Sequence, residues 1–273
     1  MIIKVLAENN TVSDEFDTEH GLSLYIETGG KKIMFDTGET DVFVKNARRL
    51  GVDLADVDMA VVSHGHCDHG GGLKTFYKEN AKAPVYLHPK AMGKYYSEHP
   101  EGREYIGLEA ADIEDNRVVL TTEHDMIGKN IEIFSNVSGR EFVSLSNRNL
   151  KMEKDGEIVG DIFEHEQNMI ITEDGKTFLF EGCAHKGIVN IIRRYYDLKH
   201  AYPDYVFGGF HLQNPSTGIS EDAELIRKIG ETLKDTGATY YTGHCTGLTP
   251  YQQLKTVMGD WLEYLATGRV LEL

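Results

Sequence analysis

The sequence is poor in basic residues, in cysteine and in long hydrophobic runs. Its 28 Lys and Arg residues stand against 44 Asp and Glu residues, which gives a formal net charge of −16. This charge repels nucleic-acid phosphates and anionic lipid surfaces, so we expect neither nucleic-acid binding nor membrane binding. Three cysteines make a poor disulfide framework, and all three lie in histidine-containing segments. We therefore expect reduced thiols.

No apolar run approaches the roughly 18 residues that cross a bilayer. The first ten residues carry Lys4 and Glu8 and lack the apolar core of a signal peptide. These absences favour a cytoplasmic protein. The 273 residues include 40% hydrophobic residues, which predicts a globular fold. We expect one domain over residues 1–273, with a charged and less regular middle region at about 95–167 that covers the substrate.

Two parts of the sequence repeat the same order of elements. Strand patterns at 22–26 and 32–35 flank a Gly-Gly turn, and patterns at 168–172 and 177–180 flank an Asp-Gly turn. Each hairpin is followed by a helix and then by a strand that ends in polar residues. The other expected elements are helices from about 41 to 51, from near 72, around 188–195, from 220 to 237 and from 249, and strands at 59–62, 85–87, 117–120, 131–134, 205–207 and 238–241.

Two similar βα halves with polar residues at equivalent strand ends predict two sheets packed face to face, with helices outside. The fold class is therefore α+β, a four-layer αββα sandwich. We expect Ser220 to cap one late helix, and Thr249 to cap the last helix with Pro250 at its first position. The apolar stripe of the last helix is interpreted as core and consists of Leu254, Val257, Met258 and Trp261.

A cluster of potential metal ligands directly follows the apolar strand at 59–62. In an extended segment His64 and His66 project to the same side, so both imidazoles can bind one ion. Beyond the strand end the backbone turns, and Asp68 and His69 can reach a second ion. Burying these four side chains without partners would cost several kcal/mol. The cluster therefore indicates a metal centre rather than core packing.

The HxHxDH spacing of this cluster resembles that of the metallo-β-lactamase superfamily, and Phe35-Asp36-Thr37-Gly38 is similar to the FDTG that precedes it there. A subgroup similar to archaeal dihydropterin ribofuranosylaminobenzene-phosphate synthases matches more of the chain. The motifs that carry this resemblance are EHGLS at 19–23, SHGHCDHGGGL at 63–73, GCAHKGIVN at 182–190, GGFHL at 208–212 and GHCTG at 243–247.

The resemblance implies that His185 and His244 complete the metal shells begun by His64, His66, Asp68 and His69. The middle histidine common in the superfamily is not evident at 134–139, and Cys183 stands where a bridging Asp is expected. We therefore expect His185 to be the third imidazole of one ion and Cys183 to be a possible ligand of the other. The implied cofactors are two divalent ions, zinc first, with iron or manganese as alternatives.

For other polar residues the sequence predicts less specific roles. Asp36 is expected to hydrogen-bond near the site. His88 is left without a role, and Cys67 and Cys245 are interpreted as buried small residues rather than ligands. An anionic substrate would need positive charge, for which Lys186, Arg140 and Arg148 are candidates. The histidines interpreted as surface residues are His99, His124, His165 and His200.

The first functional hypothesis is a hydrolase in which a hydroxide shared by two metal ions attacks a small ester, lactone or phosphodiester. Asp68 would orient the hydroxide, while His211 would orient the substrate or donate a proton. A transferase that condenses a pterin diphosphate with an aminobenzene ribose phosphate is the alternative that follows the resemblance. A third is a non-catalytic metal-binding or redox module. The sequence indicates neither the substrate nor the oligomeric state.

Overall fold

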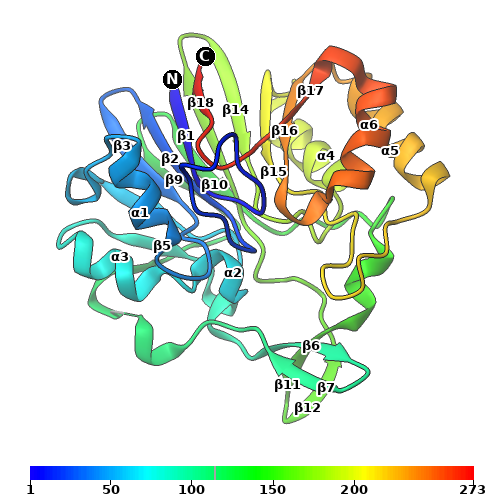
Figure 1. The fold of residues 1–273 in the computed structure, drawn as a ribbon, viewed down its shortest axis with the longest axis horizontal. Coiled ribbons are helices and arrows are strands. Elements are labelled where there is room, and N and C mark those ends of the chain that lie inside the picture. The colour runs from blue at the N-terminus through cyan, green and yellow to red at the C-terminus, as the bar shows by residue number, and fades with distance from the viewer. Residues whose placement is uncertain (114) are drawn as a thin grey trace.

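The computed structural model describes residues 1–113 and 115–273 (Figure 1). The described residues form two seven-stranded sheets and one four-stranded sheet. The two large sheets pack against each other and carry helices on their outer faces, so the predicted α+β sandwich is confirmed. Within this described part, no helix is both long enough and apolar enough to cross a bilayer.

The first sheet has the strand order β18-β1-β2-β3-β4-β5-β8. The strands from β18 to β3 pair antiparallel, and those from β3 to β8 pair parallel. Its strands are β1 (Ile2–Ala7), β2 (Ser23–Thr28), β3 (Lys31–Phe35), β4 (Met59–Val61), β5 (Val85–Leu87), β8 (Val118–Leu120) and β18 (Val270–Glu272).

The second sheet has the order β17-β16-β15-β14-β13-β10-β9. The hairpin β13-β14 continues into the parallel strands β15 and β16, just as β2-β3 continues into β4 and β5. The predicted similarity of the two halves is therefore visible in the strand pairing. Its strands are β9 (His124–Gly128), β10 (Ile131–Phe134), β13 (Asn168–Glu173), β14 (Lys176–Phe180), β15 (Tyr205–Gly208), β16 (Thr239–Thr242) and β17 (Leu262–Tyr264).

Successive side chains of the central strands alternate between two apolar layers, one between the sheets and one beneath the helices. In β3, Ile33 and Phe35 face the layer between the sheets, whereas Met34 faces the helices. In β14, Phe180 faces the same inner layer, and its ring centroid lies 5.9 Å from that of Phe35. Because successive side chains of a strand point to opposite faces, strands buried on both sides read as continuous apolar runs.

Helices cover the two outer faces (Figure 1). The helices α1 (Val42–Arg49) and α3 (Leu73–Glu79) pack on the first sheet. The helices α4 (Ile188–Lys199), α5 (Ala223–Lys234) and α6 (Leu248–Met258) pack on the second. A single turn, α2 (Cys67–Gly70), carries part of the histidine cluster. Short 3₁₀ helices lie at Leu54–Asp56, Pro89–Met92, Ala110–Asp112, Asp115–Arg117, Leu145–Asn149, His244–Thr246 and Gly259–Trp261.

The prediction that Ser220 caps a helix is wrong by two residues. Helix α5 begins at Ala223, and the side chain of Asp222 caps it by accepting hydrogen bonds from the backbone N–H groups of Glu224 and Leu225. Glu221 is turned away from the helix, where its carboxylate accepts a hydrogen bond from the Ser144 hydroxyl at 2.6 Å.

The predicted start of the last helix is also wrong. Helix α6 begins at Leu248 after Gly247, whose φ of 77° favours glycine, so Thr249 and Pro250 lie inside the first turn. Leu254 and Met258 are buried as predicted. Trp261 lies beyond the end of the helix and is 42% exposed, so it does not belong to the stripe.

The middle region contains a small sheet that sequence patterns did not predict. Its order is β12-β11-β6-β7, and it lies apart from the two large sheets at the bottom of Figure 1. Its strands are short, mostly half-buried or exposed, and rich in charged residues, so they lack the apolar alternation of buried strands. The bounds are β6 (Tyr95–His99), β7 (Gly102–Tyr105), β11 (Leu150–Lys154) and β12 (Glu157–Gly160).

Candidate metal centre

The histidine cluster lies at the carboxyl end of β4, where the chain leaves the first sheet. His64 and His69 are fully buried, and His66 is 4% exposed. The turn α2 follows and directs Asp68 and His69 away from the strand. The parallel strands β14, β15 and β16 end on the facing edge of the second sheet, and the segments that follow them carry Cys183, His185, His211 and His244.

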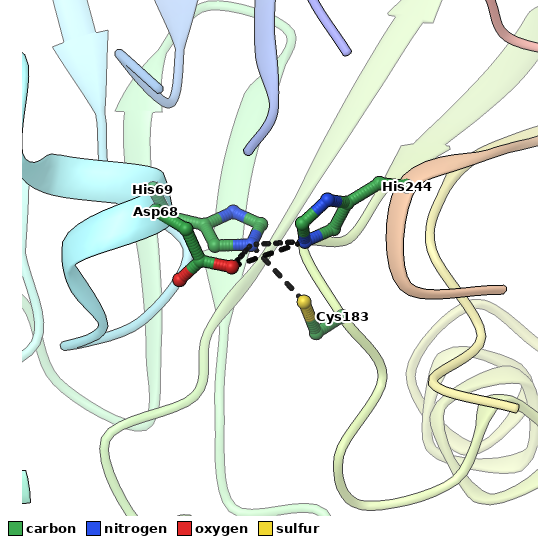
Figure 2. A group of neighbouring side chains, drawn as sticks. All are labelled: Asp68, His69, Cys183 and His244. Carbon is green, nitrogen blue, oxygen red and sulfur yellow. Dashed lines mark hydrogen bonds and ion pairs between the residues drawn. The ribbon is translucent and has the colours of Figure 1, made fainter. Parts of the chain in front are cut away.

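Four side chains from both halves converge on one point (Figure 2). The donor atoms of Asp68, His69, Cys183 and His244 all lie within 4.8 Å of one another. His69 Nε2 is 3.0 Å from Cys183 Sγ and 3.2 Å from His244 Nε2. Asp68 Oδ2 lies 3.2 Å from His244 Nε2. Carboxylate, thiolate and imidazole donors so arranged suit a divalent transition ion.

A second group of donors adjoins the first. Within the same 4.8 Å limit, His64 groups with Cys183 and His185, and it also groups with His66 and Asp68. Asp68 and Cys183 therefore belong to both groups. The structure brings all seven sequence-predicted ligand residues together, in two neighbouring positions that share a carboxylate and a thiol.

The ring orientation of these histidines fits metal binding. In four of them a neighbour holds Nδ1, which leaves Nε2 directed at the centre. The Nε2 atoms of His64, His66 and His185 are buried and have no hydrogen-bond partner among the described residues. A buried ring nitrogen without a partner is costly unless a cation occupies its lone pair. The four Nδ1 partners are Ser63 Oγ for His64 (2.9 Å), Asp36 Oδ2 for His69 (2.7 Å), Asn147 Oδ1 for His185 (2.9 Å) and Asn9 Oδ1 for His244 (2.8 Å).

The pKa values of the site histidines also fit metal binding. Burial, reinforced by the neighbouring imidazoles, lowers the pKa of His64 and His185 well below the usual 6.5. Both rings are therefore neutral and retain a lone pair. Burial opposes the charge of His244 as well, but the Cys245 sulfur and the Asp68 carboxylate raise its pKa to about 9. The Asp68 carboxylate that raises this pKa would equally attract a cation.

His211 lies beside the donor groups, but its ring is not oriented by a hydrogen bond as the rings of His69 and His244 are. It follows β15 with a φ of 49° and is 5% exposed. Within the part of the chain that the structure describes, neither of its ring nitrogens has a hydrogen-bond partner. Its ring centroid lies 4.3 Å from that of His185. Its ring also forms a third donor group with Cys183 and Cys245. This histidine is free to meet a substrate.

A cavity of about 390 Å³ opens onto these groups. Its walls include ligand candidates, His211, and Ser97, His99, Glu104 and Leu150 from the small sheet or its flank. No Lys or Arg lines it among the residues that the structure describes. The three basic residues expected to meet an anionic substrate, Lys186, Arg140 and Arg148, lie outside its walls, and Arg140 borders a separate surface cavity.

The cysteines, and the histidines outside the proposed metal shells, differ in exposure and in their contacts. All three cysteines are free thiols, and buried Cys245 accepts a hydrogen bond from the His211 backbone. His124 and His200 are exposed as predicted, and His88 accepts a hydrogen bond from the Lys90 backbone N–H. His99 is half-buried and lines the cavity rather than the outer surface.

The surface prediction for His165 is wrong, and His20 was missed. His165 is 1% exposed, and its ring centroid lies 5.1 Å from that of His66. The flanking residues Glu164 and Glu166 suggested exposure, but Glu166 is itself buried. His20 lines the cavity with Nε2 3.4 Å from Asp68 Oδ2. Its place in the EHGLS motif was the only sequence signal.

Comparisons with known proteins agree with this geometry. The sequence model described as the metallo-beta-lactamase superfamily matches residues 17–244. The chain is 28% identical to the 7,8-dihydropterin-6-methyl-4-(beta-D-ribofuranosyl)-aminobenzene-5'-phosphate synthase of Methanocaldococcus jannaschii, over 99% of this chain and 96% of that protein. It is 31% identical to an uncharacterised protein of the same organism, over 93% and 94% of the two chains.

A solved structure extends the similarity to three dimensions. The crystal structure of Tm1679, described as a metal-dependent hydrolase of the beta-lactamase superfamily, aligns with a TM-score of 0.81. The alignment covers 100% of this chain and 99% of that one, at 28% identity. The overall fold is therefore similar along the full length of the two chains.

Proposed function

The chain belongs to the metallo-β-lactamase superfamily, and we propose that it is a metal-dependent hydrolase acting on a small ester, lactone or phosphodiester. One observation carries this proposal. Imidazole Nε2 atoms from both halves point at two adjoining positions that share Asp68 and Cys183, at the base of a cavity. Similarity to a metal-dependent hydrolase over the full chain supports it.

The proposed ligands are His64, His66 and His185 for one ion and Asp68, His69 and His244 for the other, with Cys183 between them. Zinc suits this set of donors, with iron and manganese as the alternatives. Two such ions would lower the pKa of water toward neutrality, polarise a carbonyl or phosphoryl oxygen of the substrate and provide positive charge that the cavity walls lack. An anionic substrate would thus be held without Lys or Arg.

The remaining roles belong to side chains of the cavity wall. His211 has two free ring nitrogens beside His185, so we assign it to orient the substrate or to donate a proton to the leaving group. Asp68 has one carboxylate oxygen close to both His244 and His20, which fixes the orientation of the carboxylate. The small sheet of the middle region contributes cavity wall, and we propose that it covers bound substrate.

The test is hydrolysis by protein whose metal content is known. Protein purified without chelators is analysed for metal and assayed against ester, lactone and phosphodiester panels before and after chelation. We expect turnover of one class that chelation abolishes and zinc, iron or manganese restores. Asp68→Asn should abolish that turnover while the folded structure remains. Bound metal without hydrolysis of any panel would contradict the hydrolase assignment.

A transferase is the second candidate, because a synthase relative matches this chain over nearly its whole length. In that case the same metal positions would assist the departure of diphosphate from a pterin diphosphate as an aminobenzene ribose phosphate attacks. Incubating the metal-loaded protein with both substrates and following diphosphate release separates the two functions. Release that requires the second substrate favours the transferase, whereas release in water alone favours the hydrolase.

A further inference from the structure

The segment Asp161–Gln167 joins the small sheet to β13 and passes between the two halves of the metal centre. His165 and Gln167 contact the first half, where the Gln167 backbone N–H donates to the Ser63 carbonyl at 2.8 Å. Phe163 and Glu166 contact the second half. The Phe163 ring stacks on that of His185 at 4.5 Å, and the Glu166 carboxylate accepts the His185 backbone N–H at 2.7 Å. One segment therefore touches histidine-bearing backbone from both sheets.

The hydrogen bonds of His165 define its tautomer. Its Nδ1 accepts a hydrogen bond from the backbone N–H of Gly65 at 2.9 Å, so this nitrogen carries no proton. The proton lies on Nε2, which donates to Asp161 Oδ2 at 3.1 Å. Both residues are buried, with the Asp161 side chain fully shielded from solvent. Both ring nitrogens are thus engaged, unlike those of His64 and His185, whose Nε2 atoms have no hydrogen-bond partner among the described residues.

Gly65 is the residue between His64 and His66, and its position leaves no room for a side chain. A Cβ atom at Gly65 would lie 2.4 Å from the carbonyl oxygen of Ala91, so the backbone passes close to a neighbouring turn. The Gly65 N–H points away from any strand partner and is satisfied by His165. Asp161 Oδ2 is also 3.7 Å from His66 Nε2. The pair therefore contacts the centre of the His64–His66 turn and faces one of its imidazoles.

We propose that Asp161 and His165 are positioning residues that hold the His64-Gly65-His66 turn in the geometry required for metal binding. Asp161 fixes the tautomer of His165, and His165 in turn holds the Gly65 N–H. The two imidazoles on either side of Gly65 are thereby kept directed at one point. This role rests on the proposed metal-dependent function. The donor atoms of His66, Asp161 and His165 lie within 4.8 Å of one another, so the variants must separate positioning from ligation. Outer partners of metal ligands commonly change metal affinity by roughly 10- to 100-fold.

The test compares three variants with an exposed control. Asp161→Asn keeps volume but loses the charge that fixes the tautomer. His165→Leu removes the acceptor for Gly65, whereas His165→Asn keeps it, because the amide oxygen of Asn occupies nearly the place of Nδ1. His200→Asn is the control, since His200 is exposed at the end of α4 with a φ of 55° that Asn tolerates. Co²⁺ affinity is measured by chelator competition, together with the Co²⁺ absorption spectrum and the melting temperature of metal-free protein.

We expect His165→Leu to bind Co²⁺ roughly 10- to 100-fold more weakly than wild type and to change the Co²⁺ spectrum. Asp161→Asn should shift both in the same direction, and His165→Asn should recover most of the affinity. A lower melting temperature with unchanged affinity and spectrum in His165→Leu would reduce the pair to core packing and overturn the proposal. Equal loss of one metal equivalent in His165→Asn and His165→Leu would make His165 a ligand and overturn it as well.

Three further outcomes are distinguishable. If His165→Leu does not fold, wild-type affinity and spectrum in the isosteric Asp161→Asn variant overturn the proposal. If wild-type protein takes up neither Zn²⁺ nor Co²⁺, the proposed function fails and the positioning role fails with it. If wild type binds metal and all variants match it, only the positioning role fails.

Discussion

The carboxylate of Asp36 lies 2.7 Å from Nδ1 of His69 and directs Nε2 of that ring toward Cys183 and His244. The same carboxylate accepts hydrogen bonds from the backbone N–H and the hydroxyl of Ser63, the residue before His64. Asp36 has a φ of 59° and is fully buried. A single side chain at the end of β3 therefore orients the segment that carries four of the proposed ligands.

Asp36→Asn should weaken metal binding roughly 10- to 100-fold, because the amide cannot accept from Ser63 and His69 together. Asn tolerates the positive φ, so backbone strain does not contribute to the change in affinity. We expect the free energy of unfolding to fall by about 1–3 kcal/mol through the lost charged hydrogen bonds. Chelator competition measures the affinity. Asp53→Asn, at an exposed cap where Asn serves equally well, is the matched control. Equal affinities in both variants would contradict the role.

His211→Asn should lower turnover by about 10²- to 10⁴-fold, the usual contribution of a positioned proton donor. Metal content should stay at the wild-type value, because His211 is assigned to the substrate rather than to an ion. Elemental analysis and steady-state kinetics on the same preparation separate these quantities. A parallel loss of metal would place His211 with Cys183 and Cys245 as a ligand instead.

Cys183→Ser should lower the metal-to-protein ratio at both positions, since its sulfur belongs to both donor groups. Cys67→Ser is the control, because Cys67 is half-buried and its sulfur belongs to none of the donor groups found among the described residues. Elemental analysis after dialysis gives the ratio. Wild-type metal content in Cys183→Ser would remove the thiol from the proposed shells and leave an all-oxygen-and-nitrogen centre.

Glu132 on β10 gives a pH-dependent test of the fold away from the site. Burial opposes its charge, but Lys199 on α4 and His124 on β9 bind the carboxylate and lower its pKa below the usual 4.5. A carboxyl group whose pKa is lower in the folded state stabilises the protein above its unfolded-state pKa. That stabilisation is lost as the pH falls through the folded-state value.

Glu132→Gln should therefore reduce the free energy of unfolding by roughly 1.5–3 kcal/mol at pH 7, the range for hydrogen bonds to charged groups. The difference from wild type should shrink below about pH 4.5 as the wild-type carboxylate is protonated. Urea denaturation at several pH values measures it. A difference that is constant over the whole pH range would show that packing, rather than charge, is lost.

Local patterns predicted the parts of the fold that obey simple periodicity. The strands that became β4, β5 and β10, and both hairpins, match the structure to within one or two residues. Their apolar runs are buried on both faces, so the signal is strong. The spacing of His64, His66, Asp68 and His69 also predicted their convergence, because a strand end and a tight turn fix their directions.

The features that sequence patterns missed depend on contacts between distant segments. The small sheet has few buried residues, and its register depends on β6 pairing with β11 across more than fifty residues of chain. His165 lies between two glutamates, yet its burial follows from the path of the segment Asp161–Gln167 between the two halves. The start of α5 was misplaced because Ser220 pairs with Gln213 in an isolated bridge, which leaves Asp222 as the cap. The start of α6 was misplaced because the chain enters the helix directly after Gly247.

The sulfur that the two donor groups share bears on which cations the centre would accept. Magnesium and calcium prefer shells made almost wholly of oxygen, and here one carboxylate stands among imidazoles and a thiol. A thiolate between both positions biases the whole pocket toward softer, more polarisable ions. Magnesium and calcium are thereby disfavoured without any steric filter. This selectivity among cations depends largely on one sulfur atom.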